Sequence, residues 1–272
     1  EPLPTLTGFH SDLPIILGLY ELKTESDVTE YLRLLADVPR YMNEILVYEQ
    51  ERAARGLFMT GNALDTVIGQ CGAIIDARND SFLLATFHEA LDDIDGLSDN
   101  KKAQHRQQNR QLVTGSFADA YATLRNGLEA LRSSCRTAEG MYALGDDGIN
   151  YFAARMQNEG STLLDPAGAL QLLEEEMYNM IVAMSTIAME NPDALDDLEK
   201  DITTGDTAGD LDYLEKLSSG LLAPLPKHTL TVSDVPEELE SQTSPAMYVI
   251  PAVDDWKDYE VLINPSASTD TI

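Results

Sequence analysis

Residues 248–272 read YVIPAVDDWKDYEVLINPSASTDTI, and this last stretch decides how the rest of the chain is interpreted. Two short apolar runs, at 247–250 and 260–263, flank a polar and acidic connection at 254–258. Runs of this kind around a polar connection predict a β-hairpin. The chain then reaches Asn264-Pro265 and a small polar tail. We therefore expect the hairpin to form the entrance to a site whose remaining residues lie outside this polypeptide.

The composition is strongly acidic. The chain has 272 residues, 43% of them apolar, and 18 basic against 47 acidic residues give a formal net charge of −29. Such a charge repels nucleic acid at long range, so we expect no nucleic-acid partner. A solvated acidic surface explains the charge, since no D-x-[DN]-x-[DN]-G calcium loop is present. No apolar run approaches the roughly 18–20 residues of a membrane span, so no transmembrane segment is predicted.

Upstream of the hairpin, apolar residues recur at helical spacing. We expect a lead-in segment at 1–23, a helical domain at 24–222, and a Pro-rich α/β segment with the hairpin at 223–272. Thr24 and Asp27 are spaced close to a capping box, and Pro39 should break or kink the helix that follows. The predicted fold class is mainly α: an irregular multi-helix array with a small β-hairpin or sheet element near the C-terminus.

Further helix signals follow along the chain. Ser98 can cap a long helix, Asp165-Pro166 starts another, and Asn191-Pro192 repeats that start signal. Residues 134–148 indicate a flexible connector because of their glycines, and 229–232 indicate a strand. The helix after Asp165-Pro166 should turn one apolar side inward, formed by Leu170, Leu173, Met177, Ile181 and Met184.

The residues of this chain offer no recognisable catalytic or metal centre. His88-Glu89 begins like the zinc motif H-E-x-x-H, but the fourth residue on is Asp92 and no third ligand is near. The Glu174–Glu176 run lacks the histidines of a paired-carboxylate site, so a solvated helix face is the better interpretation. Cys71 fits a core thiol, and a bridge to Cys135 stays open because spacing alone cannot decide it.

The sequence resembles a known bacterial family in its final segment. SPAMYVIPAVDDWKDYEVLINP, at 244–265, is similar to the segment that leads into the active site in domain-of-unknown-function family 885. The matching positions are Pro245, Ala246, Tyr248, Pro251, Asp254, Ile263 and Asn264. The residues at 22–60, GINYFAARM at 148–156 and PLPKHTLTVSDVPEEL at 224–239 resemble further blocks of the family in the same order, with Tyr151-Phe152 in place of a Tyr-Tyr pair.

This resemblance implies a function for the whole protein. The family resembles zinc metallopeptidases of the gluzincin type, in which a helix with His-Glu-x-x-Pro-Gly-His follows the Ile-Asn strand. None of the residues here matches that motif, so no catalytic or metal-binding residue is assigned, and zinc is expected only in a missing C-terminal half. The resemblance thus implies an N-terminal fragment that is inactive alone and forms the helical wall and sheet edge of a peptide cleft.

The hairpin is also a candidate surface for binding a peptide. An edge strand can pair with an extended peptide, so either 260–264 or its partner 247–250 is a candidate, with Tyr248, Ile263 and Asn264 as substrate-binding residues. The alternative is a non-catalytic helical binding or cell-surface domain, in which both strands only complete a small sheet. Family members often resemble exported lipoproteins, so the resemblance implies a cell-envelope or extracellular location.

Overall fold

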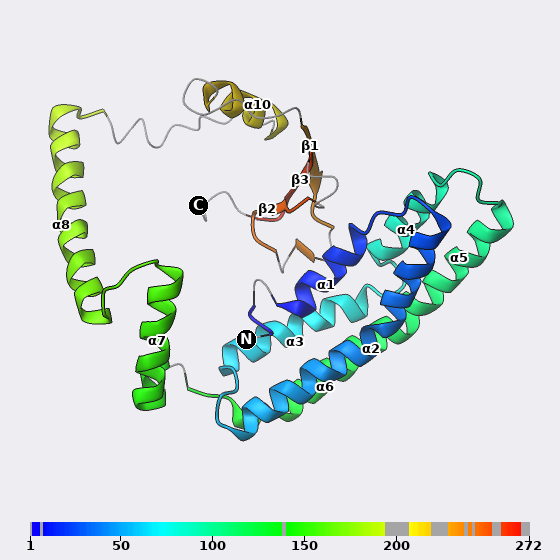
Figure 1. The fold of residues 1–272 in the computed structure, drawn as a ribbon, viewed down its shortest axis with the longest axis horizontal. Coiled ribbons are helices and arrows are strands. Elements are labelled where there is room, and N and C mark those ends of the chain that lie inside the picture. Colours follow the sequence, from blue (N-terminus) through cyan, green and yellow to red (C-terminus); the bar gives the residue numbers. More distant parts are fainter. Residues whose placement is uncertain are drawn as a thin grey trace. The chain divides into compact units, whose positions relative to one another are not determined.

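The protein is described from a computed structural model, drawn as a ribbon in Figure 1. The structure describes residues 2–5, 8–137, 140–193, 207–218, 228–236, 239–240, 243–251 and 257–267. The chain separates into two compact units. The first unit comprises Glu1–Thr137 and Pro224–Ile272, and the second unit comprises Ala138–Ala223.

Both units are built mainly from helices, which confirms the predicted mainly α class with a small sheet near the C-terminus. The first unit contains α1 (Phe9–Gly18), α2 (Glu25–Ala54), α3 (Gly61–Asp76), α4 (Phe82–Asp92), α5 (Asp99–Leu112), α6 (Ala118–Ala130), β1 (Thr229–Asp234), β2 (Ala246–Val249) and β3 (Asp258–Ile263). The second unit contains a 3₁₀ turn (Met141–Leu144), α7 (Gly145–Glu159), α8 (Pro166–Glu190) and α10 (Thr207–Ser218).

The long helix α2 begins at the predicted cap but does not break where predicted. Thr24 Oγ1 accepts a hydrogen bond from the Asp27 backbone N–H at 3.3 Å, and the Asp27 carboxylate accepts one from the Thr24 N–H at 2.7 Å. Of the two outcomes predicted at Pro39, the break is wrong, because α2 continues through it, and the kink stays a prediction. Val38 and Met42 on either side of Pro39 are buried, and this packing offsets the backbone hydrogen bond that proline removes.

The predicted long helix after Ser98 is present, with one irregular turn. A π-helical turn, Val113–Phe117, joins α5 to α6. It changes which side of the helix faces the core. In α5 only Asn109 is buried, and its Nδ2 donates to Leu83 O at 3.1 Å. The turn itself buries both Val113 and Phe117. The wider turn therefore connects a mostly polar helix to an amphipathic one.

The core of the first unit lies among α1–α6 and includes residues from the C-terminal segment. Helix α6 packs against both α2 and α3, and the three helices can be followed in Figure 1. The rings of Tyr31 and Phe87 lie 5.2 Å apart between centroids within this core. Val235, Leu239 and Leu262 join the same cluster of buried side chains. The sheet and the segment after β1 are therefore packed on the helices of the first unit.

The sheet confirms the predicted hairpin and adds a third strand. The strand order is β1-β3-β2. Strand β2 pairs antiparallel with β3, placing Met247 opposite Leu262. The strand predicted at 229–232 is present as β1, and it pairs parallel with β3, placing Ser233 opposite Leu262. Strand β3 therefore lies in the middle of the sheet and is hydrogen-bonded on both sides.

In the second unit, α8 begins as predicted but does not bury the predicted residues. Asp165 Oδ1 accepts a hydrogen bond from the Gly168 N–H at 2.7 Å, and Pro166 is the first helical residue. The predicted inward side of α8 is wrong for the described part of the chain, since no residue of α8 is buried. Apolar residues recur along α8 at helical spacing, but no described element of the second unit packs on them. The helix predicted after Asn191-Pro192 lies largely outside the described residues.

The boundaries of the two units differ from those predicted from composition. Residues 24–137 share a unit with the C-terminal segment, so the expected helical domain 24–222 is divided after residue 137. The lead-in segment contains a regular helix, α1, which buries Pro14 and Leu17. The predicted connector at 134–148 is partly helical, because α7 already begins at Gly145.

Candidate functional site

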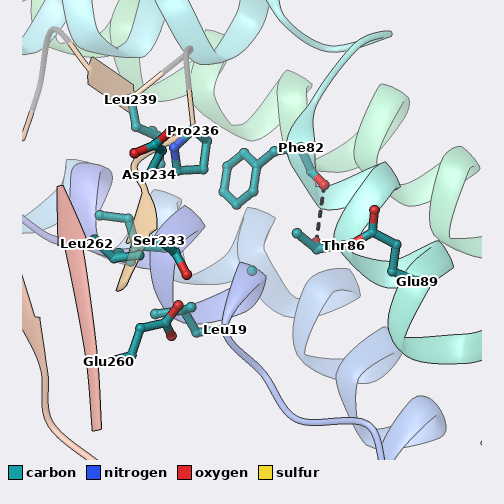
Figure 2. A pocket seen from close by; sticks show the side chains of 12 residues that line it. Leu19, Phe82, Thr86, Glu89, Ser233, Asp234, Pro236, Leu239, Glu260 and Leu262 are labelled. Atoms are coloured by element: carbon teal, nitrogen blue, oxygen red, sulfur yellow. Dashed lines mark hydrogen bonds between the residues drawn. The ribbon is translucent and has the colours of Figure 1, made fainter. Parts of the chain in front are cut away.

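A pocket lies between α1, α4 and the sheet within the first unit. Its volume is about 380 Å³. Figure 2 shows how side chains from these three parts of the fold approach one another. The lining residues are Ile15, Gly18, Leu19, Phe82, Thr86, Glu89, Ser233, Asp234, Pro236, Leu239, Glu260 and Leu262. This is the size and mixed character of a small-molecule or side-chain binding cavity.

The strand register places polar side chains on the pocket side of the sheet. Glu260 and Leu262 are two residues apart on β3, so they share the face that looks toward the helices. Thr231 lies opposite Glu260, and Ser233 lies opposite Leu262. Leu262 is buried in the core, whereas Glu260 is only partly buried beside the pocket.

The pocket combines an apolar interior with an acidic rim. Leu19, Phe82 and Leu262 supply apolar surface, while Glu89 and Glu260 supply carboxylates. No lysine, arginine or histidine is among the lining residues. The Thr86 hydroxyl donates to Phe82 O at 3.1 Å, so its proton is used within α4 (Figure 2). This arrangement suits an apolar group that carries a positive charge, such as an amine.

The opposite face of the sheet is more apolar than the face that packs on the helices. It carries Leu230, Val232, Tyr248, Tyr259, Val261 and Ile263. Leu230 is 42% exposed and Tyr248 is 55% exposed. The rings of Tyr248 and Tyr259 lie 6.0 Å apart and are stacked. A sheet normally buries its more apolar face, so this outer face suits a further layer of protein.

The three predicted substrate-binding residues occupy different environments. Tyr248 is exposed on β2, whereas Ile263 lies in the central strand β3 and pairs with residues of both neighbours. The proposed pairing of a peptide with 260–264 is therefore corrected, because β3 has no free edge. Strand β2, the other candidate, has a hydrogen-bonded partner strand on only one side in the described residues.

Asn264 has a structural function at the end of β3. Its side chain is 95% removed from solvent, since the residue is only 5% exposed. Nδ2 donates to Glu240 O at 2.6 Å and to Thr243 O at 3.2 Å, and Oδ1 accepts from the Ser266 N–H at 3.0 Å. These bonds hold the strand end against the segment before β2. Substrate binding by Asn264 stays a prediction.

The other candidate side chains do not assemble into a chemical site in the described residues. Asp92 pairs with Arg106, while His88 Nε2 is buried without a hydrogen-bond partner among them. No group of three or more His, Cys, Asp or Glu residues there is placed to hold a metal ion. Both cysteines are free thiols, so the open question of a Cys71–Cys135 bridge is answered in the negative. Burial raises the pKa of Cys71 to about 12, which keeps it protonated.

The pocket itself was not predicted from the sequence. Its lining comes from positions near 15–19, 82–89 and 233–262, which are far apart in the chain. The acidic residues involved look like ordinary surface residues when the sequence is read alone. The one available signal was the charge at position 260 inside an apolar strand pattern, since that position faces the helices.

The fold places this protein in the mainly α class, with a small sheet near the C-terminus. The residue pattern of the family described as "Bacterial protein of unknown function (DUF885)" matches residues 1–271. The chain therefore belongs to this family. No functionally curated protein matches the chain.

A solved structure has the same fold. It is described as "The crystal structure of the putative lipoprotein from Colwellia psychrerythraea". The match has a TM-score of 0.80 at 20% sequence identity and covers 97% of this chain but 49% of that chain. The chain thus spans about half the length of this structural neighbour. Among the helices that the structure describes, none is long and apolar enough to cross a membrane.

Proposed function

We propose that this chain is the N-terminal portion of a bacterial zinc metallopeptidase that acts in the cell envelope. The observation that carries the proposal is the sequence of segment 244–265, which resembles the segment that leads into a zinc helix. In this structure the segment contains the strands β2 and β3. The length of the structural neighbour, about twice that of this chain, is consistent with a second half. The description of that neighbour as a "putative lipoprotein" supports the envelope location.

Zinc does not fit the residues that are described in this chain. They contain no cluster of metal-binding side chains. We assign the ligands to residues outside the chain because the family that this sequence resembles has its zinc helix after the Ile-Asn strand. The contribution of this chain is to bind and orient the peptide. The outer face of the sheet, with Tyr248 and Tyr259, is the surface we assign to contact with the second half. The side of β2 that has no partner strand among the described residues can pair with an extended peptide backbone.

The pocket is assigned to a positively charged end of the peptide. Its acidic rim attracts an amine, and its apolar interior accepts the adjoining side chain. A peptide that carries a lysine or a free amino terminus fits this chemistry better than one that ends in a carboxylate. Glu89 and Glu260 are the side chains that select the charge, because they come from the helix side and the sheet side of the same cavity.

The test begins with the gene beyond the codon for Ile272. We expect it to encode a His-Glu-x-x-Pro-Gly-His helix, and we expect the longer protein to contain zinc and to hydrolyse peptides. Replacing the glutamate of that motif with glutamine should abolish hydrolysis while zinc is retained, and the 272-residue chain should be inactive. A gene that ends at Ile272, or a longer protein without metal-dependent hydrolysis, would disprove the proposal.

The pocket assignment is tested separately on the longer protein. Glu260→Gln should raise KM for a peptide with a positively charged end by about tenfold, because one charge-assisted contact is lost. KM for an uncharged peptide should change little. Glu240→Gln is a matched control, since Glu240 does not line the pocket. Equal effects on both peptides would show that the pocket does not select charge.

A further inference from the structure

Helix α8 carries an apolar stripe with the spacing of a coiled coil. Its members follow one another in alternating steps of three and four residues, which are the a and d positions of successive heptads. They are Leu170, Leu173, Met177, Met180, Met184 and Ile187. We call these six residues the α8 stripe. The stripe lies on one side of α8 from its first turn to its last.

The α8 stripe is exposed along its whole length. Each of its six residues exposes between 55% and 66% of its surface. No residue of α8 is buried, and no element of the second unit, in the residues that the structure describes, covers the stripe. By contrast, α2 buries one apolar face, which includes Val28, Leu35 and Met42, in the core of the first unit. A continuous exposed apolar stripe of this length marks an interaction surface.

The flanks of the α8 stripe are acidic. Glu174 lies at an e position, and Glu176 and Glu190 lie at g positions. No lysine or arginine occurs between residues 166 and 190. On the opposite side, Glu175 accepts a hydrogen bond from Gln171 Nε2 at 3.0 Å. The positions that would face a partner helix therefore carry only negative charge.

This charge decides which partner fits. A second copy of α8 brings only further negative charge and no lysine or arginine to Glu174, Glu176 and Glu190, so the charge of these side chains stays uncompensated. An anionic lipid surface is disfavoured for the same reason. A helix that has lysine or arginine beside its own apolar seam complements both the stripe and its flanks.

The methionines in the α8 stripe suit helices of varied sequence. Half of its residues, Met177, Met180 and Met184, have unbranched side chains that can fill irregular spaces. Methionine-rich surfaces of this kind adapt to partners that differ in shape. We expect affinity to depend on the basic flanks and apolar character of the partner more than on its exact side chains.

We propose that the α8 stripe is a docking surface for a basic amphipathic helix of another protein. The partner helix lies along α8 with its apolar seam on the stripe and its lysine and arginine residues beside Glu174, Glu176 and Glu190. The inference stands on α8 alone and does not depend on the proposed peptidase function.

The test measures binding of two synthetic helical peptides to the 272-residue chain by calorimetry. Both peptides have the same leucine and isoleucine seam, but one has lysine and the other glutamate at the e and g positions. We expect one basic peptide to bind per chain, and the acidic peptide to bind at least about tenfold more weakly. The affinity for the basic peptide should fall with added salt.

Variants of the chain locate the surface. Changing Met177→Asn together with Met184→Asn should weaken binding of the basic peptide by about tenfold or more, since two seam contacts are lost. Val182→Asn, the same kind of change on the far side of α8, should leave it unchanged. Replacing both Glu174 and Glu176 with glutamine should weaken binding, whereas Glu175→Gln should not. All of these residues are exposed, so circular dichroism should show unchanged folding.

Several outcomes would overturn this inference. They are a failure of both peptides to bind, equal binding of both, or binding that the seam variants do not affect. Self-association of the chain that the seam variants abolish would identify a second copy as the occupant. Binding to lipid vesicles in preference to the peptide would identify a membrane. A longer form of the protein that no longer binds the peptide would show that its own residues cover the stripe.

Discussion

His10 shows how one buried side chain links the N-terminal helix to the body of the protein. Its Nε2 lies 2.6 Å from Gln70 Oε1, and the Gln70 Nε2 donates to Thr5 O at 2.7 Å. The hydroxyl of Tyr121 donates to His10 O at 2.8 Å. Nδ1 is buried without a partner in the described residues. Burial lowers the pKa of His10 below its ordinary value of 6.5, and the hydrogen bond to Gln70 opposes this only in part.

The chain should lose stability on acidification because of His10. The native state favours the neutral ring, so the unfolded chain binds the extra proton first as the pH falls below 6.5. The contribution of the neutral His10 ring to the free energy of unfolding is therefore fully present above pH 6.5 and is lost as the pH falls below that value. Urea unfolding at several pH values should show that the free energy of unfolding falls less steeply with decreasing pH in His10→Gln than in the unchanged chain. Some dependence should remain, because burial also lowers the pKa of His88. Parallel curves for both chains would contradict the prediction.

The ion pair between Glu49 and Arg52 should matter more than ordinary surface pairs. Arg52 Nη1 lies 2.9 Å from both carboxylate oxygens of Glu49, which is fully buried. Arg52→Met removes both of these charge-assisted contacts from a buried carboxylate and should lower the free energy of unfolding by about 3–5 kcal/mol. Arg40→Met is the matched control, because Arg40 pairs with Asp37 and Glu44 on the exposed surface of the same helix. Equal losses in the two variants, measured by urea unfolding, would count against this reading.

At the scale of the helix, the sequence predicted where helices begin better than where they end or how they pack. The caps at Thr24 and Asp165 depend on residues within three positions, so the local sequence contains all the information needed. The course of α2 past Pro39 depends on side chains packed around it, and the π turn at 113–117 depends on which residues meet the core. Local patterns do not contain that information.

Replacing Pro39 should stabilise α2. Proline in a helix interior lacks an N–H and crowds the preceding turn, at a cost of about 3 kcal/mol relative to alanine. Part of this cost in free energy is offset, because proline also reduces the conformational freedom of the unfolded chain. Pro39 is only partly buried, so little packing is lost. Pro39→Ala should therefore raise the free energy of unfolding by about 1–2 kcal/mol. A decrease in urea unfolding experiments would show that the ring of Pro39 packs usefully in the native state.

At the scale of the whole molecule, the sequence predicted the parts of the candidate site but not their assembly. The hairpin at 247–263 follows from its local pattern, and β2 and β3 confirm it. The parallel pairing of β1 with β3 was not predictable, because the two strands are separated in the sequence by β2 and no local pattern shows that they pair. This pairing removes the free edge of β3 and places Glu260 beside the pocket. The pocket exists only because three distant segments fold together.

The division into two units leads to the last prediction, that the first unit folds without the second. The buried core comes from residues up to Leu128 together with Val235, Leu239 and Leu262, and it includes none of the described residues at 140–193 and 207–218. Replacing 138–223 with a flexible Gly/Ser linker should therefore preserve cooperative unfolding of the remainder. Truncation after Thr137 should destabilise it, because each of the three C-terminal core side chains contributes about 1.5–3 kcal/mol by burial. Circular dichroism during urea unfolding distinguishes the two variants. If the linker variant also failed to unfold cooperatively, the second unit would be an essential part of the fold.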